Sequence, residues 1–238
     1  LGDVYKRQHK SNPKVEDYSF DFAKKLLGEI GEKSKRYNQR LTFHPGQYNV
    51  IASPNEAAFQ HTVIDLKYHA DVLDFISEGG GGKNAVLVVH GGGIYGDKEA
   101  TIVRFIKNFP RCSENLRARF TLENDDRESL YSVGDLIKVH ESTGVPIVFD
   151  GHHWEVGAKS GSYQEDLLAA YRTWPSGVVP TLHWSNSRKE YEDSNSKVNA
   201  HTDWYYKTMP LPNLDCDVML ESKMKERALF KYVKEVSL

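Results

Sequence analysis

Six short apolar runs in the chain each end in a side chain of a type that binds divalent metals. Three of these side chains are imidazoles and three are carboxylates. In chain order they are His44, His90, Glu123, Asp150, His183 and Glu221. Imidazole combined with carboxylate suits Zn²⁺, Mn²⁺ or Fe²⁺ better than Mg²⁺ or Ca²⁺. The repeated pattern therefore predicts a metal site assembled from several separate segments.

The three carboxylates strengthen this prediction. An unpaired charge at the end of a buried run is costly, and bound cations would compensate Glu123, Asp150 and Glu221 together. A glutamate can bridge two metals about 3.5–4 Å apart, the spacing of two-metal hydrolases. Two more imidazoles, His153 and His201, are expected to join from loops. The remaining candidates, His61, His69 and His140, fall on predicted helices away from the site and are expected to be structural.

The apolar runs are predicted strands, and amphipathic helices are expected between them. The helices are predicted at about residues 19–37, from residue 55 onward, at 98–108, 129–141 and 164–173, and after Glu221. The polar stretch 185–200 is predicted to be a long surface loop. Strands that alternate with helices indicate parallel βαβ units.

Two architectures, a doubly wound sheet and a (β/α)₈ barrel, fit this alternation. In a barrel the C-terminal strand ends converge on one face, so six ligands can meet, whereas the outer strands of an open sheet lie too far apart. The expected fold is therefore α/β, a TIM-like (β/α)₈ barrel truncated at its N-terminus to about six strands. We expect one barrel domain over residues 1–238, with residues 1–8 as a non-native or disordered start.

Composition excludes several classes of protein. The 238 residues carry a formal net charge of −2, so any attraction to nucleic acid must come from a local patch or from bound cations. The two cysteines form no disulfide framework, which favours a reducing intracellular compartment. No apolar run approaches the roughly 20 residues that cross a bilayer. No membrane and no obligate protein partner is therefore expected.

Seven motifs in this chain resemble those of the UV damage endonuclease family. They lie at residues 43–48, 89–92, 122–126, 150–153, 182–185, 200–203 and 219–223, and the match runs from about residue 9 to the C-terminus. The resemblance implies a TIM-like barrel related to endonuclease IV. It also implies an enzyme that nicks double-stranded DNA on the 5′ side of pyrimidine dimers, in the cytoplasm or nucleoid of a prokaryote or the nucleus of a eukaryote. Two or three divalent ions are implied, most often Mn²⁺, with Zn²⁺ as the alternative.

The resemblance assigns the ligands to three metals. The first is held by His44, His90 and Glu123, the second by Glu123, Asp150, His183 and Glu221, and the third by His153 and His201. Among these residues, the resemblance implies catalytic roles for Glu123, His183 and Glu221.

Lesion recognition is implied for Gln47 and Tyr48, which match the pair that enters the duplex at the lesion. An aromatic ring stacks on bases and an amide bonds to base edges, which suits that task. Trp184 is expected to contribute to lesion binding. The basic side chains in residues 185–207 are expected to contact the DNA backbone. Without the resemblance, Gln47 and Tyr48 would be interpreted as an ordinary turn.

One position departs from the family pattern. The family usually has a lysine two residues before the strand-end histidine, where its modified side chain is a metal ligand, and this chain has Thr181. A threonine cannot bridge metals in that way, which favours a weaker third site. The alternatives left open are an abasic-site endonuclease of the endonuclease IV type, a sugar isomerase of the xylose isomerase type, and a damage binder without catalysis.

Overall fold

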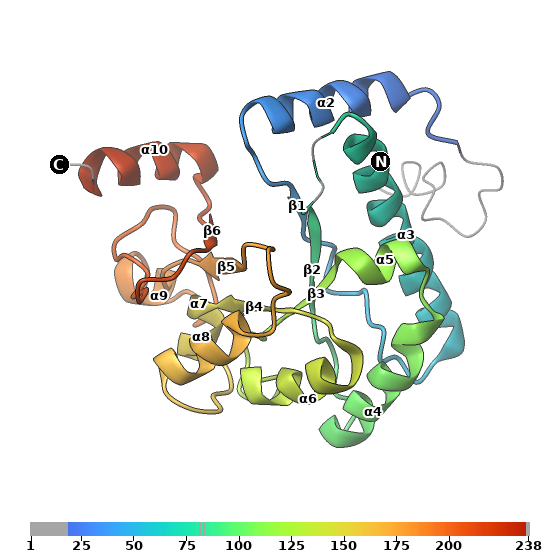
Figure 1. The fold of residues 1–238 in the computed structure, drawn as a ribbon. Coiled ribbons are helices and arrows are strands. Elements are labelled where there is room, and N and C mark those ends of the chain that lie inside the picture. Colours follow the sequence, from blue (N-terminus) through green and yellow to red (C-terminus); the bar gives the residue numbers. More distant parts are fainter. Residues whose placement is uncertain (1–18, 81, 83, 237–238) are drawn as a thin grey trace. The chain divides into compact units, whose positions relative to one another are not determined.

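The structure is a computed structural model that describes residues 19–80, 82 and 84–236 (Figure 1). The chain divides into two compact units, Leu1–Leu122 and Glu123–Leu238. Residues 1–8, expected to be a non-native start, lie outside the described residues. The expectation of one barrel domain stays a prediction.

The first unit contains three strands that follow one another in chain order, with helices between them. Its strands are β1 (Thr42–Phe43), β2 (Val86–His90) and β3 (Phe120–Glu123), the last of which ends on the first residue of the second unit. Its helical segments are α2 (Lys24–Arg36), α3 (Glu56–Glu78), α4 (Lys98–Asn108), the 3₁₀ turn η1 (Phe109–Arg111) and α5 (Glu114–Arg119). β1 and β2 pair in parallel, with Phe43 opposite Leu87.

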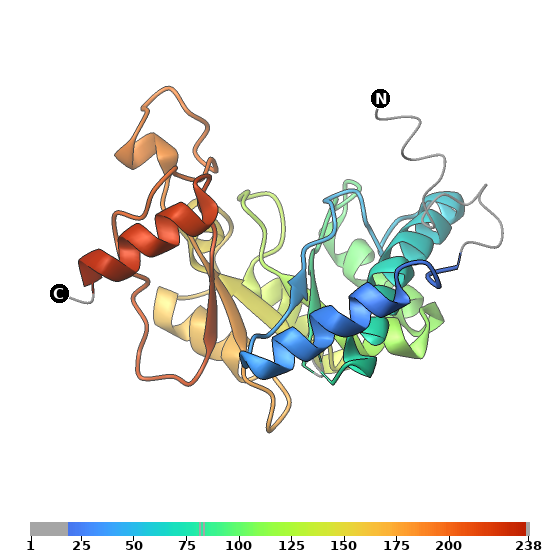
Figure 2. The ribbon, with the colours of Figure 1, turned by 90° about the horizontal axis from the view of Figure 1, so that it is seen from above.

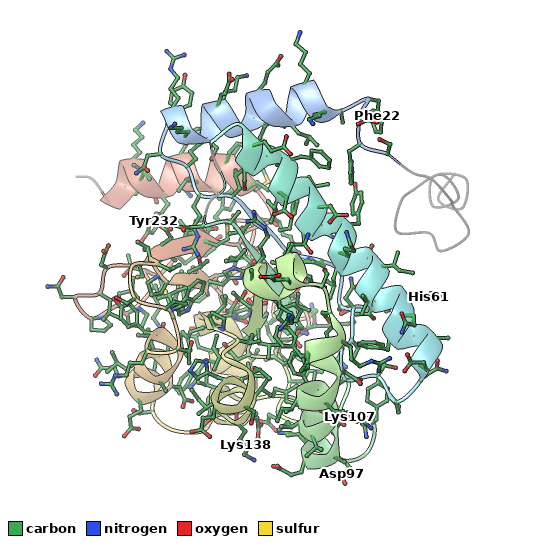
Figure 3. The ribbon with its side chains drawn as sticks, turned by 45° about the vertical axis from the view of Figure 1, so that its right-hand side comes forward. Phe22, His61, Asp97, Lys107, Lys138 and Tyr232 are labelled. Atoms are coloured by element: carbon green, nitrogen blue, oxygen red, sulfur yellow. The ribbon has the colours of Figure 1, made fainter. Side chains whose placement is uncertain are left out.

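Two local features define α3 and its packing. The helix begins where the Asn55 side chain accepts a hydrogen bond from the Ala58 N–H, a standard N-cap. It crosses α2 at a glycine contact, because a Cβ on Gly31 would lie only 2.0 Å from the carbonyl oxygen of Ile76. His61 projects outward from α3 in Figure 3, as expected for a histidine outside the site.

The second unit repeats the alternation of strand and helix. Its strands are β4 (Ile147–Asp150), β5 (Thr181–Trp184) and β6 (Asp217–Leu220). Its helices are α6 (Val133–Thr143), α7 (Gly151–Val156), α8 (Tyr163–Tyr171), α9 (Arg188–Tyr191) and α10 (Lys225–Val236). All three strands are parallel, and Figure 2 shows β6 leading into α10.

The register of these strands positions the polar residues at their ends. Asp150 pairs with His183 and His183 pairs with Met219, so β4, β5 and β6 end at nearly the same level. Every residue of β4 and β5 is buried, and Ile147, Phe149 and Leu182 belong to the core. Asp150 and His183 are titratable groups in these fully buried strands. Their protonation states therefore depend mainly on the charged groups around them.

The structure confirms the predicted α/β class and finds six strands among the described residues, each where the sequence predicted one. The helix predicted at 98–108 has those bounds, and the others differ by a few residues at their ends. The prediction that 185–200 is entirely a surface loop was wrong. Ser185, Asn186 and Ser187 are buried, and α9 lies within the stretch. Among the described residues, no helix is both long and apolar enough to cross a membrane.

Candidate metal centre

Four of the predicted ligands belong to the strand ends of the second unit. Glu123 is the last residue of β3, Asp150 the last of β4, His183 lies in β5, and Glu221 directly follows β6. The Glu221 N–H donates to the carbonyl of Trp184, which extends the pairing of β5 and β6 by one residue. The sequence prediction that these side chains end neighbouring strands is therefore confirmed for this unit.

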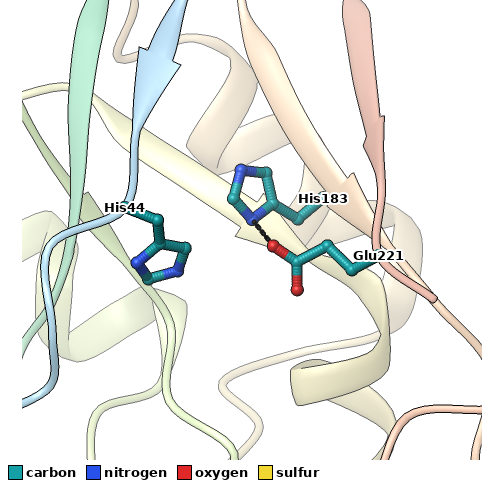
Figure 4. Close-up of side chains that lie close together, drawn as sticks. All are labelled: His44, His183 and Glu221. Atoms are coloured by element: carbon teal, nitrogen blue, oxygen red, sulfur yellow. Dashed lines mark ion pairs between the residues drawn. The ribbon is translucent and has the colours of Figure 1, made fainter. Parts of the chain in front are cut away.

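His183 lies between two carboxylates. Its Nδ1 atom is 2.8 Å from Glu123 Oε1 and 3.1 Å from Glu221 Oε1, the second contact being drawn in Figure 4. Burial by itself would lower the pKa of His183, but the Glu123 and Glu221 carboxylates outweigh it and hold that pKa well above its usual range. In the absence of a metal ion, the imidazole is thus a buried cation between two anions.

Asp150 and His153 form a second part of the same cluster. Asp150 caps α7, because its Oδ1 accepts the His153 N–H at 2.8 Å. Nδ1 of His153 is 3.8 Å from Asp150 Oδ2 and 4.0 Å from Glu123 Oε1. Glu123, Asp150 and His153 each place one ligand atom within 4.8 Å of the other two. The expectation that His153 lies in a loop was wrong, since the Asp150 cap starts a helix there.

His201 reaches the cluster from the far end of the 185–200 stretch. It pairs with Ser187 in an isolated antiparallel bridge, and the Ser185 hydroxyl lies 2.6 Å from its Nδ1. The same imidazole is 4.0 Å from Glu221 Oε2. Burial lowers the pKa of His201, so the ring is neutral at physiological pH and can serve as a ligand.

The electrostatics of this cluster fit a divalent cation. Asp150 is completely buried, and among the described residues its Oδ2 has no hydrogen-bond partner. Burial raises the pKa of Asp150, and the neighbouring Glu123 and Glu221 carboxylates add to this, against the opposing effect of His153. A carboxylate in that situation is stabilised by a bound cation, and carboxylates combined with imidazoles are a transition-metal donor set. The second unit therefore has a group of side chains that can hold a metal ion.

The first unit carries the other two predicted ligands and the predicted lesion probe. The rings of His44 and His90 lie 5.0 Å apart, centre to centre, at the ends of the paired strands β1 and β2. Gln47 and Tyr48 follow His44 in a turn, and the Tyr48 side chain is 87% exposed. Such an exposed aromatic ring is available for stacking. That His44 and His90 share a metal with Glu123 stays a prediction.

Trp184 and Thr181 have placements that bear on their expected roles. Trp184 is only 1% exposed, and its indole N–H donates to the Lys207 carbonyl at 3.0 Å. This placement favours a structural role, and its contribution to lesion binding stays a prediction. Thr181 begins β5 two residues before His183 and is buried, so a side chain at this position lies on the same face of the strand as the histidine.

Two residues near the cluster were not predicted from the sequence. His152 is fully buried, and its ring centre lies 5.2 Å from that of His201. Burial lowers its pKa to about 4, so it is neutral. Asn124 hydrogen-bonds to the main chain of Asp150 and lies beside His153. The sequence signal that could have indicated them is position: His152 directly precedes His153 in the motif at 150–153, and Asn124 directly follows Glu123 in the motif at 122–126.

Two curated relatives of this chain share one activity in their names. The UV-damage endonuclease of Schizosaccharomyces pombe is 36% identical over 93% of this chain and 38% of its own length. The UV DNA damage endonuclease of Bacillus pumilus is 33% identical over 95% of this chain and 71% of its own length. The chain thus spans well under half of the first relative and about seven tenths of the second.

The similarity to these relatives extends to a solved structure. The crystal structure of SacUVDE superposes with a TM-score of 0.81 at 30% identity, covering 96% of this chain and 76% of that one. This likeness confirms the predicted fold class, an α/β fold of the TIM-like type. The family model described as UV-endonuclease UvdE matches residues 10–238. The chain belongs to the UV-endonuclease UvdE family.

Proposed function

We propose that this chain is a metal-dependent DNA repair endonuclease that hydrolyses the phosphodiester backbone on the 5′ side of UV photoproducts such as pyrimidine dimers. The observation that supports this most is the cluster in the second unit, where six predicted metal ligands lie in successive contact. Relatives of the same family are named UV-damage endonucleases. Such an enzyme acts in the compartment that holds the genome.

The proposed cofactors are two or three divalent ions, most often Mn²⁺, with Zn²⁺ as the alternative. In the second unit, one ion would be held by Glu123, Asp150, His183 and Glu221, and another by His153 and His201. The site formed by His44, His90 and Glu123 is carried over from the family resemblance. These assignments make Glu123, His183 and Glu221 the proposed catalytic residues.

The chemistry expected of such ions is well defined. Bound divalent ions would polarise phosphate oxygens, lower the pKa of a bound water towards about 7 and stabilise the negative charge that develops on the leaving 3′-oxygen. The protein's own part is to supply ionised, buried ligands. His183 must give up its proton to become a ligand, so metal binding releases a proton, and affinity falls as the pH is lowered.

The proposed substrate is double-stranded DNA with a poorly stacked lesion. Flipping such bases costs less than the few kcal/mol of a normal pair, which gives selectivity without base-specific contacts. Gln47 and Tyr48 would fill the space that the bases leave. Of the basic residues after β5, Arg188 and Lys207 form ion pairs with Asp203 and Glu155, whereas Lys189 and Lys197 are exposed and are the stronger candidates for phosphate contacts.

A nicking assay with a defined lesion tests this function. The chain is incubated with Mn²⁺ and three duplexes of one sequence, which contain a single pyrimidine dimer, an abasic site or no lesion. A nick immediately 5′ of the dimer supports the proposal. Cleavage of the abasic duplex alone would identify an endonuclease IV-type activity, and binding to the dimer without a nick would identify a damage binder. Isomerisation of an aldose or ketose, with no nick in any duplex, would identify the sugar isomerase alternative.

A further inference from the structure

Asn124 connects the end of β3 to the end of β4 through its side chain. Its Nδ2 donates to the Asp150 carbonyl at 3.0 Å, and its Oδ1 accepts the Asp150 N–H at 2.8 Å. The residue is buried and directly follows Glu123. The Asn124 side chain therefore holds the main chain of Asp150 in place relative to the end of β3. The residues on the two sides of this contact, Glu123 and Asp150, are both predicted metal ligands.

The main chain of Asn124 makes a third contact, with His153. Its carbonyl oxygen lies 2.9 Å from His153 Nδ1. A carbonyl oxygen only accepts hydrogen bonds, so Nδ1 carries a proton, and in the neutral imidazole the lone pair is on Nε2. Histidine ligands commonly donate their second ring N–H to a backbone carbonyl, which fixes both the tautomer and the orientation of the ring.

We infer that Asn124 is a positioning residue that aligns Glu123, Asp150 and His153 and holds His153 in the tautomer with the proton on Nδ1. This inference rests on the proposed metal centre. Asn124 is not a ligand in it, because both polar atoms of its side chain are used by the main chain of Asp150. It acts by holding three ligands that come from β3, β4 and α7 in one geometry, before a metal ion binds.

A buried asparagine can also serve the fold alone, and Asn108 provides the comparison. Asn108 is buried, its Nδ2 donates to the Ile51 carbonyl at 2.9 Å, and its Oδ1 accepts from Arg111 at 3.1 Å. Neither Ile51 nor Arg111 is a predicted metal ligand. Asn108→Ala thus removes a comparable buried amide without touching the three ligands, and it serves as the matched control.

The first measurement uses the unmodified chain without metal. Nitrogen-15 NMR of the histidine rings at alkaline pH, with His153 identified by the loss of its signals in His153→Gln, reports which ring nitrogen carries the proton. The expected result is a protonated Nδ1 and a bare Nε2. A proton on Nε2 would overturn the inference, and this result does not depend on any variant of Asn124 being able to fold.

The second measurement is calorimetric titration with MnCl₂ of Asn124→Ala and Asn108→Ala, each checked for folding by circular dichroism. Loss of a residue that orients ligands lowers metal affinity about 10–100-fold, and this range is expected for Asn124→Ala. Asn108→Ala should bind Mn²⁺ as the unmodified chain does. Equal affinity in a folded Asn124→Ala variant would overturn the inference. An unmodified chain that binds Mn²⁺ but does not nick DNA would contradict only the proposed function.

Discussion

The Nδ1 atom of His183 lies 2.8 Å from Glu123 Oε1, and both side chains are buried at the ends of strands β5 and β3. This contact joins the acidic residue with which β3 ends to the imidazole of β5. In the metal-free state it is an ion pair, because the carboxylates keep His183 protonated against the effect of burial. A cation that binds there replaces a proton on the imidazole and takes over the role of neutralising Glu123.

Replacing Glu123 by glutamine should therefore disable the centre. The amide keeps the shape of the side chain but removes the charge that a metal ion needs, so we expect nicking of a dimer-containing duplex to fall by at least about 100-fold, at the scale of losing a group that stabilises the transition state. Initial rates in Mn²⁺ measure this. The control is Glu128→Gln, which changes an exposed carboxylate. Nicking at the normal rate by Glu123→Gln would rule out the proposed bridging role.

The buried carboxyl of Asp150 should destabilise the metal-free protein at neutral pH. Its pKa in the folded state is raised above the unfolded value of about 3.9, first by burial and then by Glu123 and Glu221. A group with a raised folded pKa contributes stability below the unfolded pKa, and that contribution is lost as the pH rises through the folded value. Asp150→Asn should therefore melt at a higher temperature than the unmodified chain in EDTA at pH about 7, and the gap should narrow towards pH about 4.

Addition of Mn²⁺ should reverse this order. A ligand that binds only the folded state adds stability in proportion to the logarithm of its concentration over its dissociation constant. The unmodified chain should gain melting temperature with Mn²⁺, and Asp150→Asn should gain less, because it lacks one ligand of the ion assigned to Glu123, Asp150, His183 and Glu221. Asp215→Asn, which alters an exposed carboxylate, should behave like the unmodified chain. A variant Asp150→Asn that melts lower in EDTA would show that the carboxylate is already stabilised without a metal.

The strand ends were predictable from the sequence to within about one residue. The apolar runs before His90 and Asp150, and the mostly apolar run before Glu123, leave little freedom in where a buried strand stops, because the first titratable group ends the pattern. The parallel arrangement followed from the intervening helices. For this reason the predicted ligands at the strand ends of the second unit could be placed from the sequence.

The supporting residues could not be predicted in the same way. The role of Asn124 depends on the distance between its amide and the main chain of Asp150, and that distance is a product of the fold. Helix α7 was missed because Gly151 and two histidines have no strong helical pattern. Its start depends on the hydrogen bond from the His153 N–H to Asp150, a capping contact three residues apart. The buried Ser185–Ser187 segment was missed because polar composition was interpreted as exposure.

The exposed turn of the first unit should matter for substrate choice and little for stability. Gln47 and Tyr48 are exposed, so replacing both by alanine should change the free energy of unfolding by about 0.5 kcal/mol or less. Base stacking is worth about 1–3 kcal/mol for each aromatic contact, so preference for the dimer duplex over an undamaged one should fall roughly tenfold. Competition binding with the two duplexes measures this preference.

A second exposed tyrosine of the same unit provides the control. Tyr37 is 62% exposed at the end of α2, and Tyr37→Ala should leave the preference unchanged. A double variant at Gln47 and Tyr48 that retained full preference would exclude these two residues as the lesion probe. A loss that affected both duplexes equally would indicate general DNA binding instead.

Thr181 should be replaceable by valine. The side chain is 2% exposed, and among the described residues its hydroxyl oxygen has no hydrogen-bond partner. Removing an unsatisfied buried hydroxyl while keeping the shape should raise the free energy of unfolding by up to about 1 kcal/mol. Thermal unfolding measures the gain, and metal analysis should find the same number of Mn²⁺ ions bound. Loss of one ion in Thr181→Val would identify the hydroxyl as a ligand.

Helix α7 has only six residues, and its first turn depends on Asp150, a side chain that is also a proposed ligand. So short a helix has little stability of its own, and its amide groups exchange with solvent whenever the turn opens. Metal ions bound by Asp150 and by His153 would hold both residues of the cap in place. The rate of amide hydrogen exchange in Gly151–Val156 should therefore fall as the metal centre is occupied. This rate would measure metal occupancy in an experiment that requires neither DNA nor catalysis.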